Sequence, residues 1–148
     1  MEEKLSMRGD VDIVLRGPDG QIKETRKVKN LVVATGLTFI ASRMGGTSAS
    51  VMSHMALGSG TTAAAANQTD LVSILGSREA LDSTTPSSNT IVYVASFEAG
   101  DATGAVTEAG LFNASSGGDM LCRTVFSVVN KAADDTMSIT WTITLSAS

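Results

Sequence analysis

Apolar and polar residues alternate strictly near the end of the chain, between residues 137 and 145. One parity holds only large apolar residues: Met137, Ile139, Trp141, Ile143 and Leu145. The other parity holds a serine and three threonines. Because successive side chains of a strand point to opposite faces, this period of two predicts a strand with one face on a core. The β-branched threonines favour a strand even where they face water.

That strand is the last of three in the segment 106–145. A glycine-rich turn at 115–119 and a polar turn at 130–135 separate the three. Glycine supplies the positive φ that tight turns need. We therefore expect an antiparallel meander that the rest of the chain completes. Its predicted inner face holds Leu111, Phe126, Ile139, Trp141 and Ile143.

An N-terminal hairpin is predicted over residues 7–30. Val11, Ile13 and Leu15 share one parity of a strand, and Pro18, Asp19 and Gly20 then provide a turn. The returning strand has few apolar residues. A hairpin this polar is not stable alone, so we expect it to lean on the domain or on a neighbouring subunit. We expect the charged residues 1–6 to form an arm in front of it.

One helix is predicted, over residues 35–44. Leu37, Phe39, Ile40 and Met44 fall at helical spacings, and Thr35 can cap the N-terminus. Arg43 suits the negative end of the helix dipole, and two glycines follow as a stop signal.

Further strands are predicted at 51–58, 77–84 and 91–97, with a surface loop over 61–76. The total is about eight short strands separated by turns, which is typical of a sandwich, jelly roll or barrel. We predict an all-β antiparallel sandwich or jelly roll with one short helix. The chain divides into an arm (1–6), a hairpin (7–30) and the sandwich (31–148), which together make a single domain.

Composition narrows the possible functions of this 148-residue chain. Charged residues make up 18%, below the roughly 25% typical of soluble domains, which suggests that other subunits cover part of the surface. The net charge of −4 argues against a nucleic-acid-binding domain. No apolar run follows the N-terminal Met-Glu-Glu-Lys, so we expect no signal peptide, and no stretch is long enough for a membrane span.

Basic residues concentrate in the predicted hairpin. These are the candidate contacts to other subunits: Arg8, Arg16, Lys23, Arg26, Lys27 and Lys29. No aromatic residues stand beside them to stack on bases, so nucleic-acid contact is not predicted. Arg8, Gly9 and Asp10 spell an integrin-type adhesion tripeptide, which we interpret as coincidence because tripeptides recur by chance.

The residues that usually carry chemistry are few. One histidine and one cysteine cannot build an ordinary metal site, and His54 is the only base for a catalytic triad. We interpret His54 as a core or interface residue and Cys122 as a small buried hydrophobe. The glycines around Ser59 lack the lysine of a phosphate loop. Asp134 and Asp135 could bind calcium, but an acidic pair in a turn is usually just solvated. We predict no enzyme, no metal and no cofactor.

Glu108 is the charged residue that stands out, because its neighbours in the predicted strand are apolar or small. A buried carboxylate must be paired. Arg78 and Arg123 also occupy strand positions and are the candidate partners. A catalytic acid is the alternative, but no second carboxylate lies nearby in the sequence. We favour a structural salt bridge.

Four segments resemble small virion proteins of tailed bacteriophages, namely head decoration (cement) proteins of jelly-roll type. They read VKNLVVATGLTFIASRM (28–44), MSHMALGSGTTAAAA (52–66), TEAGLFNASSGGDMLCRTVF (107–126) and DTMSITWTITL (135–145). The resemblance covers most of the chain after residue 27. It implies that Glu108, Gly110, Phe112, Arg123 and Trp141 are scaffold residues. The hairpin falls outside the pattern.

The resemblance also implies a role. A cement protein sits on the outside of the capsid, in the virion, and stabilises joints between major capsid protein subunits. The chain would be made in the cytoplasm of the host bacterium and would act as a dimer or trimer. A strand or arm at its edge could reach a neighbour by strand addition.

Two other roles stay open at this point. Similar wording occurs in phage tail or fibre components, so a tail-fibre adaptor or receptor-binding module is the alternative within the virion. A carbohydrate-binding or hydrolytic jelly roll is the third. It would need an aromatic platform or a carboxylate pair, and we expect Trp141 and Tyr93 both to lie inside.

Overall fold

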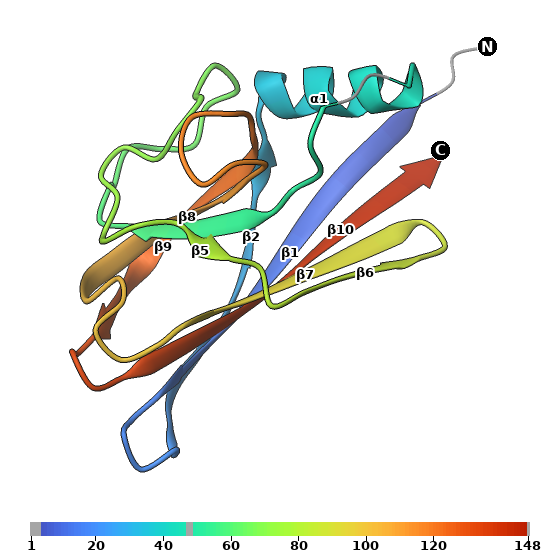
Figure 1. Ribbon diagram of the computed structural model, residues 1–148. Helices are drawn as coiled ribbons and strands as arrows, with labels where there is room; N and C mark the ends of the chain where they lie inside the picture. The colour runs from blue at the N-terminus through green and yellow to red at the C-terminus, as the bar shows by residue number, and fades with distance from the viewer. Residues whose placement is uncertain (1–3, 47–48, 148) are drawn as a thin grey trace.

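The computed structural model describes residues 4–46 and 49–147, which form two five-stranded antiparallel sheets packed face to face (Figure 1). The first sheet has the order β2 (Ile22–Lys29), β1 (Leu5–Arg16), β10 (Thr136–Ala147), β7 (Thr90–Phe97) and β6 (Ser83–Ser87). The second has the order β3 (Leu31–Val32), β9 (Met120–Lys131), β8 (Gly104–Phe112), β4 (His54–Gly58) and β5 (Glu79–Ala80). Helix α1 spans Ala34–Met44. The predicted all-β sandwich with one helix is confirmed, with more strands than expected.

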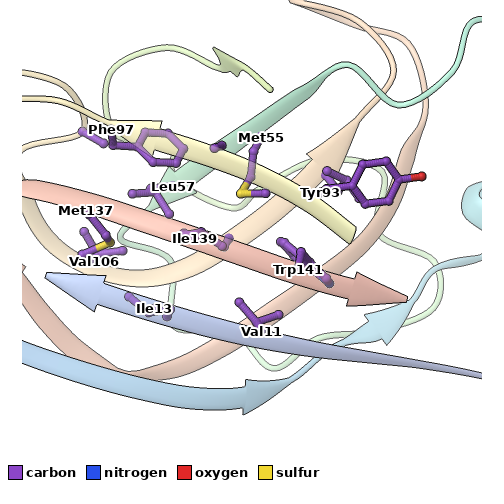
Figure 2. Close-up of a cluster of buried hydrophobic side chains, with 14 of the residues drawn as sticks. Val11, Ile13, Met55, Leu57, Tyr93, Phe97, Val106, Met137, Ile139 and Trp141 are labelled. Atoms are coloured by element: carbon purple, nitrogen blue, oxygen red, sulfur yellow. The ribbon is translucent and has the colours of Figure 1, made fainter. Parts of the chain in front are cut away.

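The alternation in β10 builds the centre of the core. Met137, Ile139 and Trp141 are completely buried, and Ile143 is nearly so. Trp141 lies between Val11 of β1 and Tyr93 of β7 in the sheet register. Figure 2 shows these side chains meeting the residues of the second sheet. As expected, both Trp141 and Tyr93 lie inside, so neither forms an exposed aromatic platform.

The predicted meander over 106–145 is wrong in one respect. β8 and β9 form a hairpin in the second sheet, but the chain then crosses over and β10 joins the first sheet. Alternation predicts a strand with one buried face, but it does not indicate which sheet the strand joins. The partners of β10 are β1 and β7, which lie far from it in the sequence.

The N-terminal hairpin is part of the sandwich and does not stand apart from it. β1 pairs along its whole length with β10, and over Asp10–Arg16 it also pairs with β2. Val11, Ile13 and Leu15 are buried, because the strand alternation places them on the inner face. β1 already begins at Leu5, so the last two residues of the predicted arm, Leu5 and Ser6, belong to a strand; residues 1–3 of the arm lie outside the described residues. The candidate contact residue Arg16 donates a hydrogen bond across the hairpin turn to the carbonyl of Gly20 (3.1 Å).

The region 77–89 also differs from the prediction. The single strand expected at 77–84 is split into β5, in the second sheet, and β6, in the first. The chain changes sheets at residues 81–82, where the N–H of Leu81 bonds to Ser53 and that of Asp82 bonds to Val94. β6 is an edge strand and contains Pro86, which an edge tolerates because it needs no second hydrogen-bonding partner.

Helix α1 matches the predicted helix within one residue, but its N-terminus differs. Val33 occupies the capping position, without a side-chain cap. Thr35 lies inside the helix and donates to the carbonyl of Met120 in β9 (2.9 Å). The C-terminus ends at Gly45 with Arg43 in the last turn, as expected. The helix packs closely on β9, since a Cβ built on Gly36 would lie 2.2 Å from the carbonyl oxygen of Leu121.

Asn30 links the hairpin to the core. Its Oδ1 accepts a hydrogen bond from Trp141 Nε1 (2.7 Å), and its N–H donates to the carbonyl of Gly9 (3.2 Å). A Cβ built on Gly9 would fall 1.3 Å from the same Oδ1. Gly9 is therefore required for close approach, which explains the middle residue of the Arg-Gly-Asp sequence.

We expect Gly9→Ala to lower the free energy of unfolding by about 1 kcal/mol, because the Asn30 side chain must leave Trp141 Nε1 without its acceptor. Chemical denaturation measures the loss, and the indole Nε1–H signal in NMR should shift. Gly17→Ala is a suitable comparison, since the nearest atom to its Cβ lies at 3.1 Å on an exposed aspartate. An unchanged indole signal in Gly9→Ala would contradict the assignment.

Candidate functional site

A second hydrophobic cluster lies on the outer face of the second sheet. It consists of Val33, Ala56, Leu71, Phe112 and Met120, all buried. Ala56 and Phe112 have the opposite parity to their main-core neighbours on β4 and β8, so their side chains point away from the first sheet. A register shift between β8 and β9 places Met120 opposite Phe112. A loop over residues 59–78, which we call the cover loop, supplies Leu71 to this cluster. The second sheet is consequently buried on both faces around β8.

Glu108 fixes the cover loop to the sheet. Its side chain is completely buried in the same layer. Oε2 accepts hydrogen bonds from the backbone N–H of Gly60 (2.7 Å) and of Ser73 (2.8 Å). Oε1 accepts from the N–H of Val72 (2.9 Å) and from Arg123 Nε (3.0 Å). The carboxylate therefore collects three backbone donors of one loop and one side-chain donor of the neighbouring strand.

Arg123, also completely buried, extends this network across the loop. Its Nη1 donates to the carbonyl of Thr62 and to Oε1 of Gln68, both at 2.9 Å. Its Nη2 lies 2.9 Å from Glu108 Oε1, but makes no hydrogen bond of good geometry within the described residues. The pair joins β8, β9 and both halves of the cover loop. We call Glu108, Arg123 and their loop donors the buried clamp.

The clamp leaves Glu108 charged. Burial alone would raise the pKa of Glu108, but the hydrogen bonds from Val72, Ser73, Arg123 and Gly60 outweigh it, so the pKa is lower than usual. A general acid needs a raised pKa and access to substrate. Glu108 has neither, because both of its oxygens are engaged by internal donors and its side chain is buried.

We expect the clamp to make stability depend on acid. Since the folded pKa of Glu108 is depressed, its contribution is fully present above the unfolded pKa and is lost as pH falls through the folded pKa. Denaturation midpoints should therefore stay constant as the pH is lowered from neutral, and should decrease once the pH falls through the ordinary pKa of a glutamate toward the lower pKa of folded Glu108. In Glu108→Gln this acid-dependent loss should be smaller. An identical pH profile in the two proteins would show that Glu108 does not titrate with unfolding.

Arg78 is not the partner of Glu108, so that candidate pairing is wrong. Its guanidinium lies over the Phe112 ring, 3.7 Å from the centroid. Nη1 donates to the carbonyls of Ala114 (2.9 Å) and Gly117 (2.8 Å), and Nη2 lies 3.6 Å from Asp70. Arg78 thus ties the end of the cover loop to the β8–β9 turn. The sequence suggested two arginines for one carboxylate, and only the sheet register decides between them.

Three of the candidate contact residues in the hairpin form exposed ion pairs with aspartates of β1. Lys27 pairs with Asp12 (2.9 Å), and both Arg8 (2.9 Å) and Lys29 (3.5 Å) approach Asp10. β2 is an edge of the first sheet, and lysines on an edge strand disfavour pairing with another strand. The Arg8–Asp10 pair also occupies both charged ends of the Arg-Gly-Asp sequence inside a strand.

The other basic residues of β2 connect this strand of the first sheet to β9 of the second sheet and to the β9–β10 turn. Arg26 binds Glu24 of its own strand (2.6 Å) and donates to the carbonyls of residues 127 and 128 in β9. Lys23 pairs with Asp135 at 2.8 Å, which holds the pKa of that carboxyl below its usual value. Asp135 is buried, contrary to the expectation of a solvated acidic pair. Lys23 and Arg26 therefore both attach β2 to β9 and the turn that follows it.

Lys131 is a buried charge that the sequence did not suggest. It ends β9, and its Nζ donates to the carbonyl of Glu98 (2.9 Å). Burial lowers the pKa of Lys131, and Asp101, Asp135 and Glu98 partly counter this effect. The nearby Asp134–Asp135 pair was the only signal of a charged cluster at this turn.

A groove opens between α1 and the adjacent end of the first sheet. Its volume is about 540 Å³. The floor and walls are mostly apolar side chains: Met7, Phe39, Ile40, Met52, Tyr93 and Ile143. The sequence contained one signal for it, since the inward parity of β1 and β10 continues to Met7 and Leu145. The sequence did not indicate that the start of β1 and the end of β10 lie beside α1.

The remaining candidates lack the arrangement of a reactive centre. Among the described residues, no group of three or more His, Cys, Asp or Glu side chains could hold a metal ion. His54 Nδ1 shares a hydrogen bond with Ser53 (2.8 Å), and Cys122 is buried, which raises the pKa of its thiol. No helix in 4–46 or 49–147 is long and apolar enough to span a membrane.

Neither protein-family models, nor curated proteins, nor solved structures give a match to the chain.

Proposed function

We propose that the chain is a non-enzymatic structural protein of a tailed-bacteriophage virion. It binds the outer surface of the capsid and stabilises joints between major capsid protein subunits. The first support is the sequence resemblance. Of the two segments that carry it most specifically, 108–113 forms the second half of β8 and the residue after it, and 139–143 forms the centre of β10. They are thus parts of the scaffold, as the resemblance implies, and the sandwich is compatible with a jelly-roll relative.

The observation that carries the proposal is the buried clamp. The most elaborate polar constellation of the described residues is directed inward, and every donor and acceptor named for Glu108 belongs to the chain itself. It fixes a long loop as a second layer over the sheet. Such an internal network suits a structural protein that must keep its fold under mechanical stress in the capsid. It also leaves Glu108 without access to a substrate.

The proposed partners are the major capsid protein and further copies of the chain. Many copies on one shell act together, so each contact can be modest. Nucleic acid, membrane and cofactors have no part in the proposal. The chain is made in the host bacterial cytoplasm and joins the capsid exterior there.

Binding to capsids tests the proposal. Purified chain is mixed with capsids of the encoding phage that lack it, and the bound fraction is measured by sedimentation. We expect saturable binding at hundreds of copies per particle, and electron microscopy should place the added density on the outer shell. Bound capsids should also resist heat better than bare ones.

The copy number separates the proposal from its alternative. A few copies per virion, located on the tail, would overturn the capsid role and favour the tail-fibre adaptor or receptor-binding module. A serum protein of similar size serves as the control for non-specific sedimentation.

A further inference from the structure

Exposed apolar side chains gather at the end of the molecule that carries α1. Ten large hydrophobic residues are exposed among those the structure describes. Five of them belong to this end: Leu5, Leu37, Met44, Val51 and Leu145. Figure 1 shows the reason, since α1 lies where β1 begins and β10 ends. We call these five residues, together with the groove beside them, the α1 end face.

The groove continues the core of the sandwich. Met7, Ile143 and Leu145 share the inward parity of β1 and β10, and Ile91 and Tyr93 share that of β7. The first sheet therefore extends past the second sheet, and α1 covers this extension only in part. Met44 (83% exposed) and Val51 (58%) stand on the rim of the hollow, and Leu5 (74%) lies two residues from Met7 on the same face of β1. Projecting apolar groups and a hollow to receive them occur on one surface.

Charge favours this face for contact between like molecules. The chain has a net charge of −4, so two copies repel each other over most approaches. Among the residues that the structure describes, those lining the groove include one charged side chain, Arg43, and no carboxylate. Arg43 donates to the carbonyl of Ala49 (2.8 Å), which holds it at the rim. Two copies that meet here bring no acidic groups of the groove together.

We propose that the α1 end face is the interface between two copies of this chain, related by a twofold axis. Met44 and the apolar rim of each copy enter the groove of the other. A twofold contact requires one patch to be complementary to itself, and the pairing of projections with a hollow on one surface meets that requirement. The inference rests on the homo-oligomeric part of the proposed function and names the surface for it.

The edges of the first sheet do not compete for this role. β2 carries Lys27 and Lys29, and β6 is short and contains Pro86. Both features disfavour strand addition. β1 is paired on both sides only over Asp10–Arg16; its residues before Asp10 pair with β10 alone, and Leu5 and Met7 among them belong to the α1 end face itself.

Sedimentation velocity over a range of concentrations tests the inference on the full chain without capsids. We expect a dimer for the natural sequence. Met44→Lys should weaken the dimer about 100-fold or more, because an unpaired lysine would enter an apolar groove. The variant should still fold, since Met44 is exposed in the last helical turn, where a cation suits the helix dipole. Circular dichroism and the melting temperature check this.

Matched variants make the result specific. Val51→Lys, at 58% exposure on the rim, should also weaken the dimer, whereas Ile22→Lys, at 54% exposure on β2, should leave it unchanged. A monomer at all concentrations, a trimer, an oligomer insensitive to Met44→Lys, or equal sensitivity to Ile22→Lys would each overturn the inference.

Capsid binding of the same variants separates this inference from the proposed function. A dimer that Met44→Lys dissociates, but that binds no capsid, would leave the interface standing and remove the capsid role. A chain that stays monomeric at all concentrations but binds capsids would overturn the interface and leave the capsid role standing.

Discussion

Replacing Glu108 with glutamine is expected to lower the free energy of unfolding by about 3–5 kcal/mol, because it leaves the buried Arg123 charge without its partner. The two side chains are completely buried and 2.9 Å apart. Glutamine keeps the shape but has one acceptor oxygen, whereas Glu108 accepts at both oxygens from Gly60, Val72 and Ser73. One or more loop N–H groups would therefore face an amide donor. The variant tests charge and hydrogen bonding without opening a cavity.

Two measurements define the outcome for Glu108→Gln. Denaturant unfolding gives the loss of stability, and hydrogen exchange should show faster exchange at residues 60, 72 and 73 than at the centre of β10. Asp12→Asn is the matched control, because Asp12 forms an exposed pair with Lys27 and should cost about 1 kcal/mol or less. A double variant, Glu108→Gln with Arg123→Met, should recover part of the loss, since no buried charge remains in the clamp. A loss no larger than that of Asp12→Asn would contradict the clamp.

Changing Gly36 to alanine is expected to destabilise the protein by about 1–3 kcal/mol, although alanine normally favours a helix over glycine. The added Cβ would lie 2.2 Å from the carbonyl oxygen of Leu121, which belongs to the backbone of β9 and cannot rotate away. Helix α1 must then move off the sheet. That movement would also weaken the contact between Thr35 and the carbonyl of Met120.

Gly45→Ala provides the control for Gly36→Ala. Gly45 follows the same helix, its φ is −83°, and its Cβ would meet only ordinary contacts at 3.6 Å. We expect its effect on stability to stay within about 0.5 kcal/mol. The comparison uses thermal and denaturant unfolding of both variants. A stabilising Gly36→Ala would mean that the helix does not pack against Leu121 as closely as described.

The candidate site was partly visible in the sequence. Glu108 stood out because a carboxylate between apolar and small residues needs a partner, and Arg123 was one of two arginines available. The backbone donors of Gly60, Val72 and Ser73 carried no such signal, since every non-proline residue has an N–H. Gly110 shows the same limit. It belongs to the resemblance, but only the position of Leu71 above it shows what the missing side chain makes room for.

The sequence by itself determined most of the strands, the helix and the all-β sandwich class, because alternation, helical spacing and turn residues act over a few neighbouring positions. It determined which faces of β1 and β10 are buried for the same reason. Only the tertiary structure decided that β10 leaves the meander for the first sheet, that Arg123 rather than Arg78 meets Glu108, and that the hairpin is part of the core. These outcomes depend on contacts between segments far apart in the chain, and the free energy of such contacts comes from burial and register that local patterns do not encode.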